Sequence, residues 1–229
     1  MSDTKTRFER LVALCAGNDA AAWLAATAGG LGRDGLERLC GAYTAAAVRV
    51  GRMPVAPTVA AHPDLAPASP APTLERWTAD DAARAVLLLS AAEAMSSDGF
   101  VDAATACYER GDSREQQSWL RALALLPDAG RFLGLAIDAC RTNIVPLFEA
   151  IACENPYPAR FFPERNFNQM VLKALFNSIA LARIVGLPSR LNAELSRMAG
   201  DYAAERRAAG RTVPADIGMA MHQSTSLQS

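Results

Sequence analysis

The sequence predicts an all-α protein, and three observations lead to this fold class. Hydrophobic residues make up 51% of the 229 residues and aromatic residues only 7%, and the hydrophobic fraction rests on alanine and leucine, which favour helices. Apolar residues recur at steps of three and four, as in Leu36, Leu39, Tyr43 and Ala47, which places them on one helix face. Runs of β-branched residues, which are typical of strands, are scarce.

The expected architecture follows from the lengths of these helices. Short helices that are joined by tight turns bury their apolar faces only by stacking pair on pair. We therefore expect stacked antiparallel helix pairs, as in a HEAT-like or another α-α superhelical bundle. The helices are irregular in length and no strict repeat period is present, so a consensus array is not expected.

The first expected domain is an N-terminal helical unit over residues 1–53. Helical periodicity runs over residues 4–16, then from Asn18 to about Ala28, and again over 34–52. Asn18 is a good N-cap, and Gly29 and Gly30 are expected to end the second helix. These three helices form the unit.

Residues 54–77 are expected to be a proline- and alanine-rich linker or a long surface loop. Six of the 13 prolines lie between Pro54 and Pro72, so neither a helix nor a central strand is expected to persist there. A mobile tether is one interpretation of this segment, and a proline-rich ligand for a partner is the other.

The main helical domain is expected over residues 78–209. Thr78 with Asp81 forms a capping box at the start of its first helix, which is apolar nearly all round and is therefore expected between layers. We expect a polar, disordered tail over residues 210–229. The later boundaries that the sequence predicts are an Asp98 cap, an Asp112 cap, a helix from Asp128, a helix over 145–153, an irregular segment over 154–163, an Asn166 cap paired with Gln169, and a last helix from Pro188.

Charge and hydropathy exclude several classes of protein. A formal net charge of -1 lacks the positive patch that non-specific nucleic-acid binding needs, so no nucleic-acid partner is expected. The charged N-terminus has no secretory signal pattern, and no apolar segment is long enough to span a membrane. We expect a cytoplasmic protein, in which the five scattered cysteines are reduced and mostly buried.

No cofactor or metal site is expected either. The two histidines, His62 and His222, lie in segments that we expect to be unstructured, which argues against histidine-containing metal sites and catalytic triads. Asp80 and Asp81 resemble an aspartate-rich diphosphate motif, but Arg84 and Ala85 stand where a further carboxylate is needed, and capping explains the pair better. No glycine-rich phosphate loop is present.

One segment is a candidate site. Asn166, Gln169, Lys173 and Asn177 follow each other at helical spacing and form a polar stripe on an otherwise apolar helix. Either Asn166 and Gln169 hold the preceding loop while Lys173 reaches water or pairs with Glu154, or the stripe lines a pocket for a small, partly apolar molecule. The loop residues expected to join it are Asn155, Tyr157, Phe161 and Phe162.

The same segment carries a family resemblance. The sequence NPYPA at 155–159, followed by NQMVLKALF at 168–176, resembles the signature of the EboA family of bacterial metabolite-traffic proteins. The match with this signature covers about a tenth of the chain. The alanine-rich first half and the proline-rich segment carry no such match.

The resemblance implies a gene cluster that also encodes a UbiA-like membrane prenyltransferase and that makes or moves a secondary-metabolite precursor. It favours a non-enzymatic cytoplasmic binding or scaffold protein, which hands a hydrophobic or prenylated metabolite to partner proteins and lies close to the inner membrane through them. The alternative is a metal-independent enzyme that modifies the precursor, with Lys173 as base or electrostatic stabiliser. An apolar pocket without converging titratable groups favours the first function, and a buried Lys173 facing Glu154 or Tyr157 favours the second.

Overall fold

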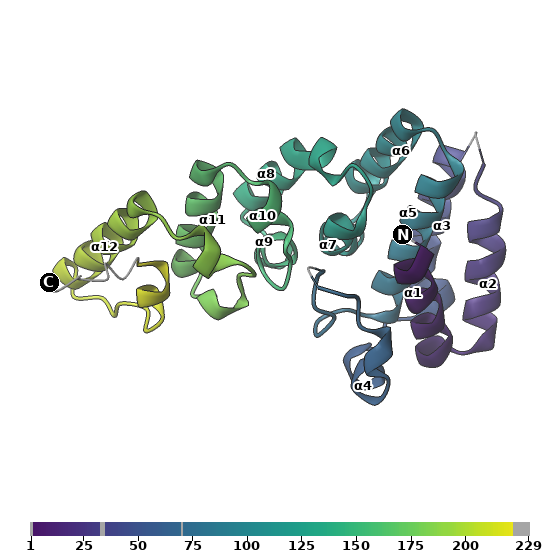
Figure 1. Cartoon of the computed structure of the whole chain (residues 1–229), viewed down its shortest axis with the longest axis horizontal. Helices are drawn as coiled ribbons and strands as arrows, with labels where there is room; N and C mark the ends of the chain where they lie inside the picture. The colour runs from purple at the N-terminus through teal and green to yellow at the C-terminus, as the bar shows by residue number, and fades with distance from the viewer. Residues whose placement is uncertain (1, 33–34, 70, 222–229) are drawn as a thin grey trace, which may run out of the picture. The chain divides into compact units, whose positions relative to one another are not determined.

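The computed structural model describes residues 2–32, 35–69 and 71–221 and confirms the all-α fold class (Figure 1). These residues form twelve α-helices and six short 3-10 helices. They contain no strand, and one isolated antiparallel bridge joins Pro54 and Thr78. Their contacts divide the chain into two compact units between Ile151 and Ala152. A HEAT-like repeat stays a prediction, as do the domain boundaries expected from the sequence.

Helix α5 (Ala79–Ala94) is the centre of the first unit. Every residue from Ala79 to Ala91 is buried, and the helix packs against neighbours on several sides (Figure 1). This confirms the position between layers that its apolar sequence predicts, since alanine-rich surfaces let neighbouring helices approach closely. The neighbours are α1 (Ser2–Ala16), α2 (Asn18–Gly29), α3 (Gly35–Val50), α6 (Ser97–Arg110) and α7 (Ser113–Ala122).

The start of α5 carries a buried polar network. Thr78 and Asp81 form the predicted capping box. Asp80 Oδ2 accepts from Arg84 Nη1 at 2.7 Å, and Asp81 Oδ2 accepts from Arg121 Nη1 at 2.8 Å. Both carboxylates are therefore neutralised by guanidinium groups, which is how buried charges are stabilised.

The proline-rich segment contains more regular structure than its composition predicts. Helix α4 (Ala56–Ala61) and the 3-10 helix η1 (Pro63–Leu65) lie within it, so the expectation that no helix persists there is wrong. Pro57 and Pro63 occupy first-turn positions, where the missing N–H has no helical partner to lose. Both α4 and η1 pack against α1. Val55 and Leu65 in this segment are buried.

Several helix ends in the first unit differ from the expected ones. Ser96, and not Asp98, caps α6, because its hydroxyl accepts from the Gly99 N–H. Asp112 caps α7 as expected, with Glu115 completing a capping box. After Asp128 the chain forms one 3-10 helix before it becomes α-helical. The elements that follow α7 are η2 (Leu123–Leu125), η3 (Ala129–Phe132), α8 (Leu133–Arg141) and α9 (Val145–Ala152).

The second unit contains three α-helices and three 3-10 helices within the described residues. The segment expected to be irregular holds a five-residue helix, and α11 begins at Glu164, directly after Pro163. Asn166 therefore lies inside α11 and does not cap it. The elements are α10 (Tyr157–Phe161), α11 (Glu164–Phe176), η4 (Leu181–Arg183), η5 (Leu187–Arg190), α12 (Ala193–Ala208) and η6 (Ile217–Ala220).

The last helix also starts later than the sequence predicts. Pro188 lies in η5, and α12 begins after Asn192, whose side chain accepts from the Leu195 N–H at 2.8 Å. Within the expected tail, η6 buries Ile217 and Ala220. Residues 222–229, with His222, lie outside the described residues.

Candidate functional site

The NPYP segment is held in place by its first residue and by the glutamate before it. Asn155 Oδ1 accepts from the Tyr157 N–H at 3.0 Å, which starts α10 in the way that asparagine side chains start turns. Glu154 just before it adopts a positive φ of 53°. Its N–H donates to the Arg183 carbonyl at 2.8 Å, and Arg183 binds its carboxylate through two bonds of 2.7 and 3.0 Å.

Of the three aromatic residues expected to line a pocket, Tyr157 packs against both of the others. The ring centroid of Tyr157 lies 4.7 Å from that of Phe161 and 6.2 Å from that of Phe162. Tyr157 and Phe162 are buried, and Phe161 is half-buried. Burial raises the pKa of the Tyr157 hydroxyl above its ordinary value. At neutral pH Tyr157 is therefore a neutral member of a buried cluster.

Arg190 ties this segment to α11, and sequence reasoning did not single it out. Its guanidinium donates to the carbonyls of Ala159 at 2.6 Å and Phe162 at 2.7 Å. The same group lies over the Phe167 ring, 4.6 Å from the centroid. Arginine suits this position because its planar group hydrogen bonds at the edge and stacks on its face. The sequence gives no signal for this role of Arg190, because the carbonyls that Arg190 binds are backbone groups, which every residue has.

A second contact that the sequence did not reveal joins α11 and the cap of α12. Asn168 is buried within α11 and exchanges two hydrogen bonds with the Asn192 amide, at 3.1 and 3.0 Å. Asn168 belongs to the NQMVLKALF sequence, but its position beside the polar stripe gave no reason to expect a buried partner.

The four side chains of the predicted polar stripe on α11 differ in their exposure. Gln169 and Asn177 are exposed, and Asn166 and Lys173 are half-buried. The structure therefore places the stripe and the buried aromatic cluster in different surroundings. Two pockets, one in each unit, are lined by other residues, and none of the eight predicted residues lines either of them.

The pocket of the second unit has a volume of about 480 Å³ and lies at the C-terminal end of α11. Leu175, which belongs to the NQMVLKALF sequence, lines it together with Ile179, Val213 and Pro214. Arg206 and Asp216 also line it, but both bind backbone: Arg206 donates to the Thr212 carbonyl at 2.8 Å and Asp216 accepts from the Leu181 N–H at 2.6 Å. The pocket thus combines apolar walls with two charged groups that hold the backbone around it.

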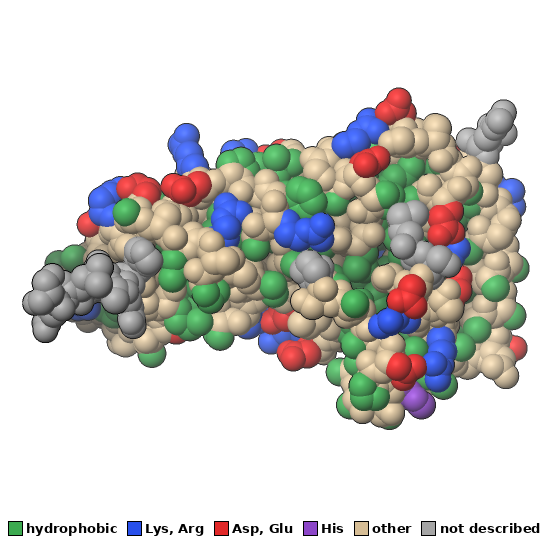
Figure 2. All heavy atoms as spheres, in the orientation of Figure 1, with side chains coloured by type: hydrophobic (Ala, Val, Ile, Leu, Met, Phe, Trp, Pro, Cys, Tyr) green, Lys and Arg blue, Asp and Glu red, His purple; other side chains and the backbone are tan. Residues whose placement is uncertain are grey.

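Metal-binding clusters and membrane-spanning helices are absent from the described ranges. No group of three or more His, Cys, Asp and Glu side chains in these ranges is arranged to hold a metal ion. In that part of the chain no helix combines the length and hydropathy that crossing a membrane requires. Figure 2 shows acidic and basic side chains interspersed among the described residues on the face that it draws.

Comparison with known proteins identifies a family for the chain. The family model described as "Metabolite traffic protein EboA" matches residues 8–222. The match therefore extends well beyond the short sequences at 155–159 and 168–176. No curated protein and no solved structure matches the chain.

Proposed function

Because the chain belongs to the EboA family of metabolite traffic proteins, we propose that it binds a small, largely apolar metabolite without reacting with it and passes it to partner proteins. The observation that carries this proposal is the pocket in the second unit. Its volume of about 480 Å³ is in the usual range of small-molecule sites, and apolar walls with a few polar groups are typical of them.

The charged groups at this pocket support binding more than catalysis. Arg206 and Asp216 each bind a backbone group beside the pocket, so we assign to them the role of holding its shape. A hydrophobic or prenylated molecule can place its chain against Leu175 and Pro214 while its polar end stays near these two groups. In this proposal the protein works in the cytoplasm and releases the molecule to a membrane enzyme of the UbiA-like prenyltransferase type.

A substitution at the pocket tests the proposal. Ala180 is exposed and lines the pocket, so Ala180→Trp fills the space without removing a buried side chain. Ala182 is also exposed but does not line it, which makes Ala182→Trp the matched control. Native mass spectrometry of the three proteins, each purified from the source host, measures the fraction that carries a small molecule.

We expect wild-type protein and Ala182→Trp to carry the same bound mass and Ala180→Trp to lose most of it. The proposal fails if wild-type protein carries no bound organic molecule. It also fails if Ala180→Trp retains the molecule at the wild-type level.

We further propose that the polar stripe of α11 contacts a partner protein. Gln169 and Asn177 are exposed amides, and removing exposed side chains usually changes stability by less than about 0.5 kcal/mol. We therefore expect Gln169→Ala with Asn177→Ala to leave the denaturation midpoint unchanged but to reduce co-purification of proteins from the same gene cluster. Asn18→Ala is the control, because Asn18 is another exposed amide and lies inside α2, where Gly17 and not the predicted Asn18 is the N-cap. Unchanged co-purification by the double variant contradicts this role.

A further inference from the structure

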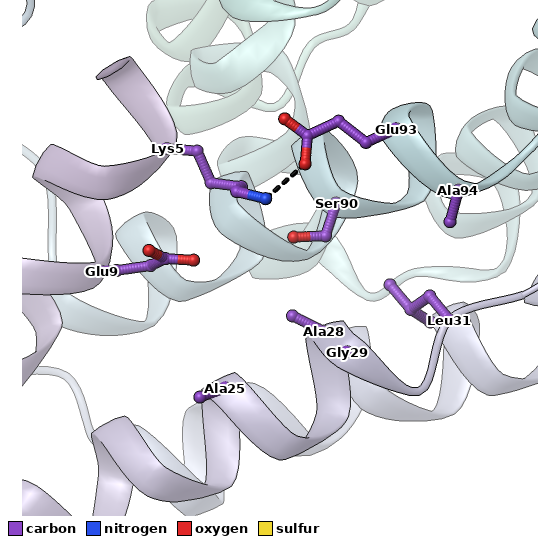
Figure 3. A pocket seen from close by; sticks show the side chains of 9 residues that line it. All are labelled: Lys5, Glu9, Ala25, Ala28, Gly29, Leu31, Ser90, Glu93 and Ala94. Atoms are coloured by element: carbon purple, nitrogen blue, oxygen red, sulfur yellow. Dashed lines mark hydrogen bonds and ion pairs between the residues drawn. The ribbon is translucent and has the colours of Figure 1, made fainter. Parts of the chain in front are cut away.

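A second pocket lies in the first unit, where α1, α2 and α5 come together (Figure 3). Its volume is about 420 Å³. Helix α1 contributes Lys5 and Glu9, α5 contributes Ser90 and Glu93, and α2 contributes small residues. It shares no lining residue with the pocket of the second unit, so its binding properties are independent of the proposed function.

The Ser90 hydroxyl is the unusual group of this pocket. Ser90 is only 5% exposed, and its Oγ has no hydrogen-bond partner among the described residues. Figure 3 shows this hydroxyl pointing from α5 into the space between α1 and α2. A buried hydroxyl without a partner destabilises the folded state, and a native structure keeps few of them. A ligand that hydrogen bonds with Ser90 would remove this cost.

The charges around Ser90 indicate which kind of ligand fits. Lys5 forms an ion pair with Glu93, so its positive charge is already neutralised. The Glu9 carboxylate is half-buried and has no ion-pair or hydrogen-bond partner within the described ranges. Because a carboxylate only accepts hydrogen bonds, Glu9 favours a ligand that donates them and disfavours an anion.

The remaining walls of the pocket are apolar and consist mostly of small residues. Ala25, Ala28 and Gly29 line it from α2, and Ala94 lines it from α5. A Cβ atom added at Gly29 would meet nothing within 4 Å, so there is open space beside it. A compact hydrocarbon body can therefore lie against the alanines while its polar end reaches Glu9 and Ser90.

We propose that this pocket binds a small primary amine, with its ammonium group between Glu9 and Ser90 and its hydrocarbon part against α2. A protonated amine neutralises Glu9 and gives Ser90 Oγ a donor at the same time. A charge-assisted hydrogen bond of this kind is stronger than one between neutral groups, which distinguishes an amine from an alcohol of the same shape.

The test compares three probes of similar shape on the full chain: cyclohexylamine, cyclohexanol and cyclohexanecarboxylate. Amide chemical shifts in an NMR titration report both affinity and location. We expect saturable shifts in α1, α2 and α5 with the amine. The alcohol should bind at least roughly tenfold more weakly than the amine, and the carboxylate should cause no such shifts. Equal binding of amine and alcohol, or no saturable shift at this pocket with the amine, overturns the proposal.

Substitutions identify the groups involved. Glu9→Gln and Ser90→Ala keep the shape of the pocket, and each should weaken amine binding several-fold or more, while Ser90→Ala should leave the protein at least as stable as wild type because it removes an unpartnered hydroxyl. Glu109→Gln changes an exposed glutamate that does not line the pocket, so it should leave the affinity for the amine unchanged. Unaltered amine affinity in both pocket variants would assign the binding elsewhere and overturn the proposal.

Discussion

At the scale of single residues, side chains of the second unit hydrogen bond with much of its irregular backbone. Arg190 binds the carbonyls that end α10, and Asn155 binds the N–H group that starts it. Gly186 adopts a φ of 77°, and a Cβ atom there would lie 2.7 Å from the Ala159 Cβ. Only glycine fits such a position without strain. These residues explain how a segment rich in proline and aromatic residues becomes ordered.

Tyr157 offers a test of what the aromatic cluster does. Its side chain is fully buried, and truncation of a buried aromatic residue usually costs roughly 3–5 kcal/mol. We expect Tyr157→Ala to lower the free energy of unfolding by about that amount, and Phe161→Ala, at a half-buried position, to lower it less. Urea denaturation measures both values.

The result also decides the role of Tyr157 in function. A large loss of stability assigns it to the core of the second unit. A nearly unchanged unfolding free energy in Tyr157→Ala, together with lost activity, would instead support a direct contact with a ligand or partner.

The sequence suggested the family from one short segment, but it did not predict the long-range contacts that this segment makes. The short sequences at 155–159 and 168–176 are specific enough to suggest the family, which the match over residues 8–222 confirms. The polar stripe followed from helical spacing alone. Asn168, Arg190 and Asn192 were missed because their partners come from distant parts of the sequence, and helical spacing carries no information on such contacts.

At the scale of the elements, helix ends show where local signals suffice. The Thr78 capping box and the Asp112 cap were predicted and are present, since the groups that form each of them lie within four residues of sequence. The predicted starts of α6, α11 and α12 lie two to five residues from the observed ones, because several capping residues or prolines compete there. The proline-rich segment contains α4 because its prolines fall in first turns.

The Asp112 cap has a measurable dependence on pH. Hydrogen bonds from the N–H groups of Glu115 and Arg114 lower the pKa of its carboxyl below the ordinary value. A carboxyl group with a lowered pKa in the folded state contributes stability above its unfolded pKa, and that contribution is lost as the pH falls through the folded pKa. Asp112→Ala should therefore cost about 1 kcal/mol at neutral pH and less at acidic pH.

Chemical denaturation of wild type and Asp112→Ala checks this pH dependence. It is measured at about pH 7 and about pH 3, which lie on either side of the ordinary pKa of aspartate. Asp112→Asn is the control, because asparagine is also a good N-cap but does not titrate. A stability difference between wild type and Asp112→Ala that grows on acidification would contradict the assigned cap.

At the scale of the whole molecule, composition was sufficient to predict the fold class. Alanine- and leucine-rich segments with helical periodicity gave helices, and the apolar α5 lies inside the first unit as expected. The division between Ile151 and Ala152 has no composition signal, since it falls at the end of α9. The two pockets were not predicted either, because each is lined by segments that are separate in sequence.

The proposal that this chain carries a metabolite is tested most directly by a crystal structure of the protein purified from its source host. We expect electron density for an organic molecule in the pocket of the second unit, against Leu175 and Pro214, with Arg206 and Asp216 still bound to their backbone partners. A pocket filled only by solvent would contradict the account, and so would a molecule bound covalently to Lys173.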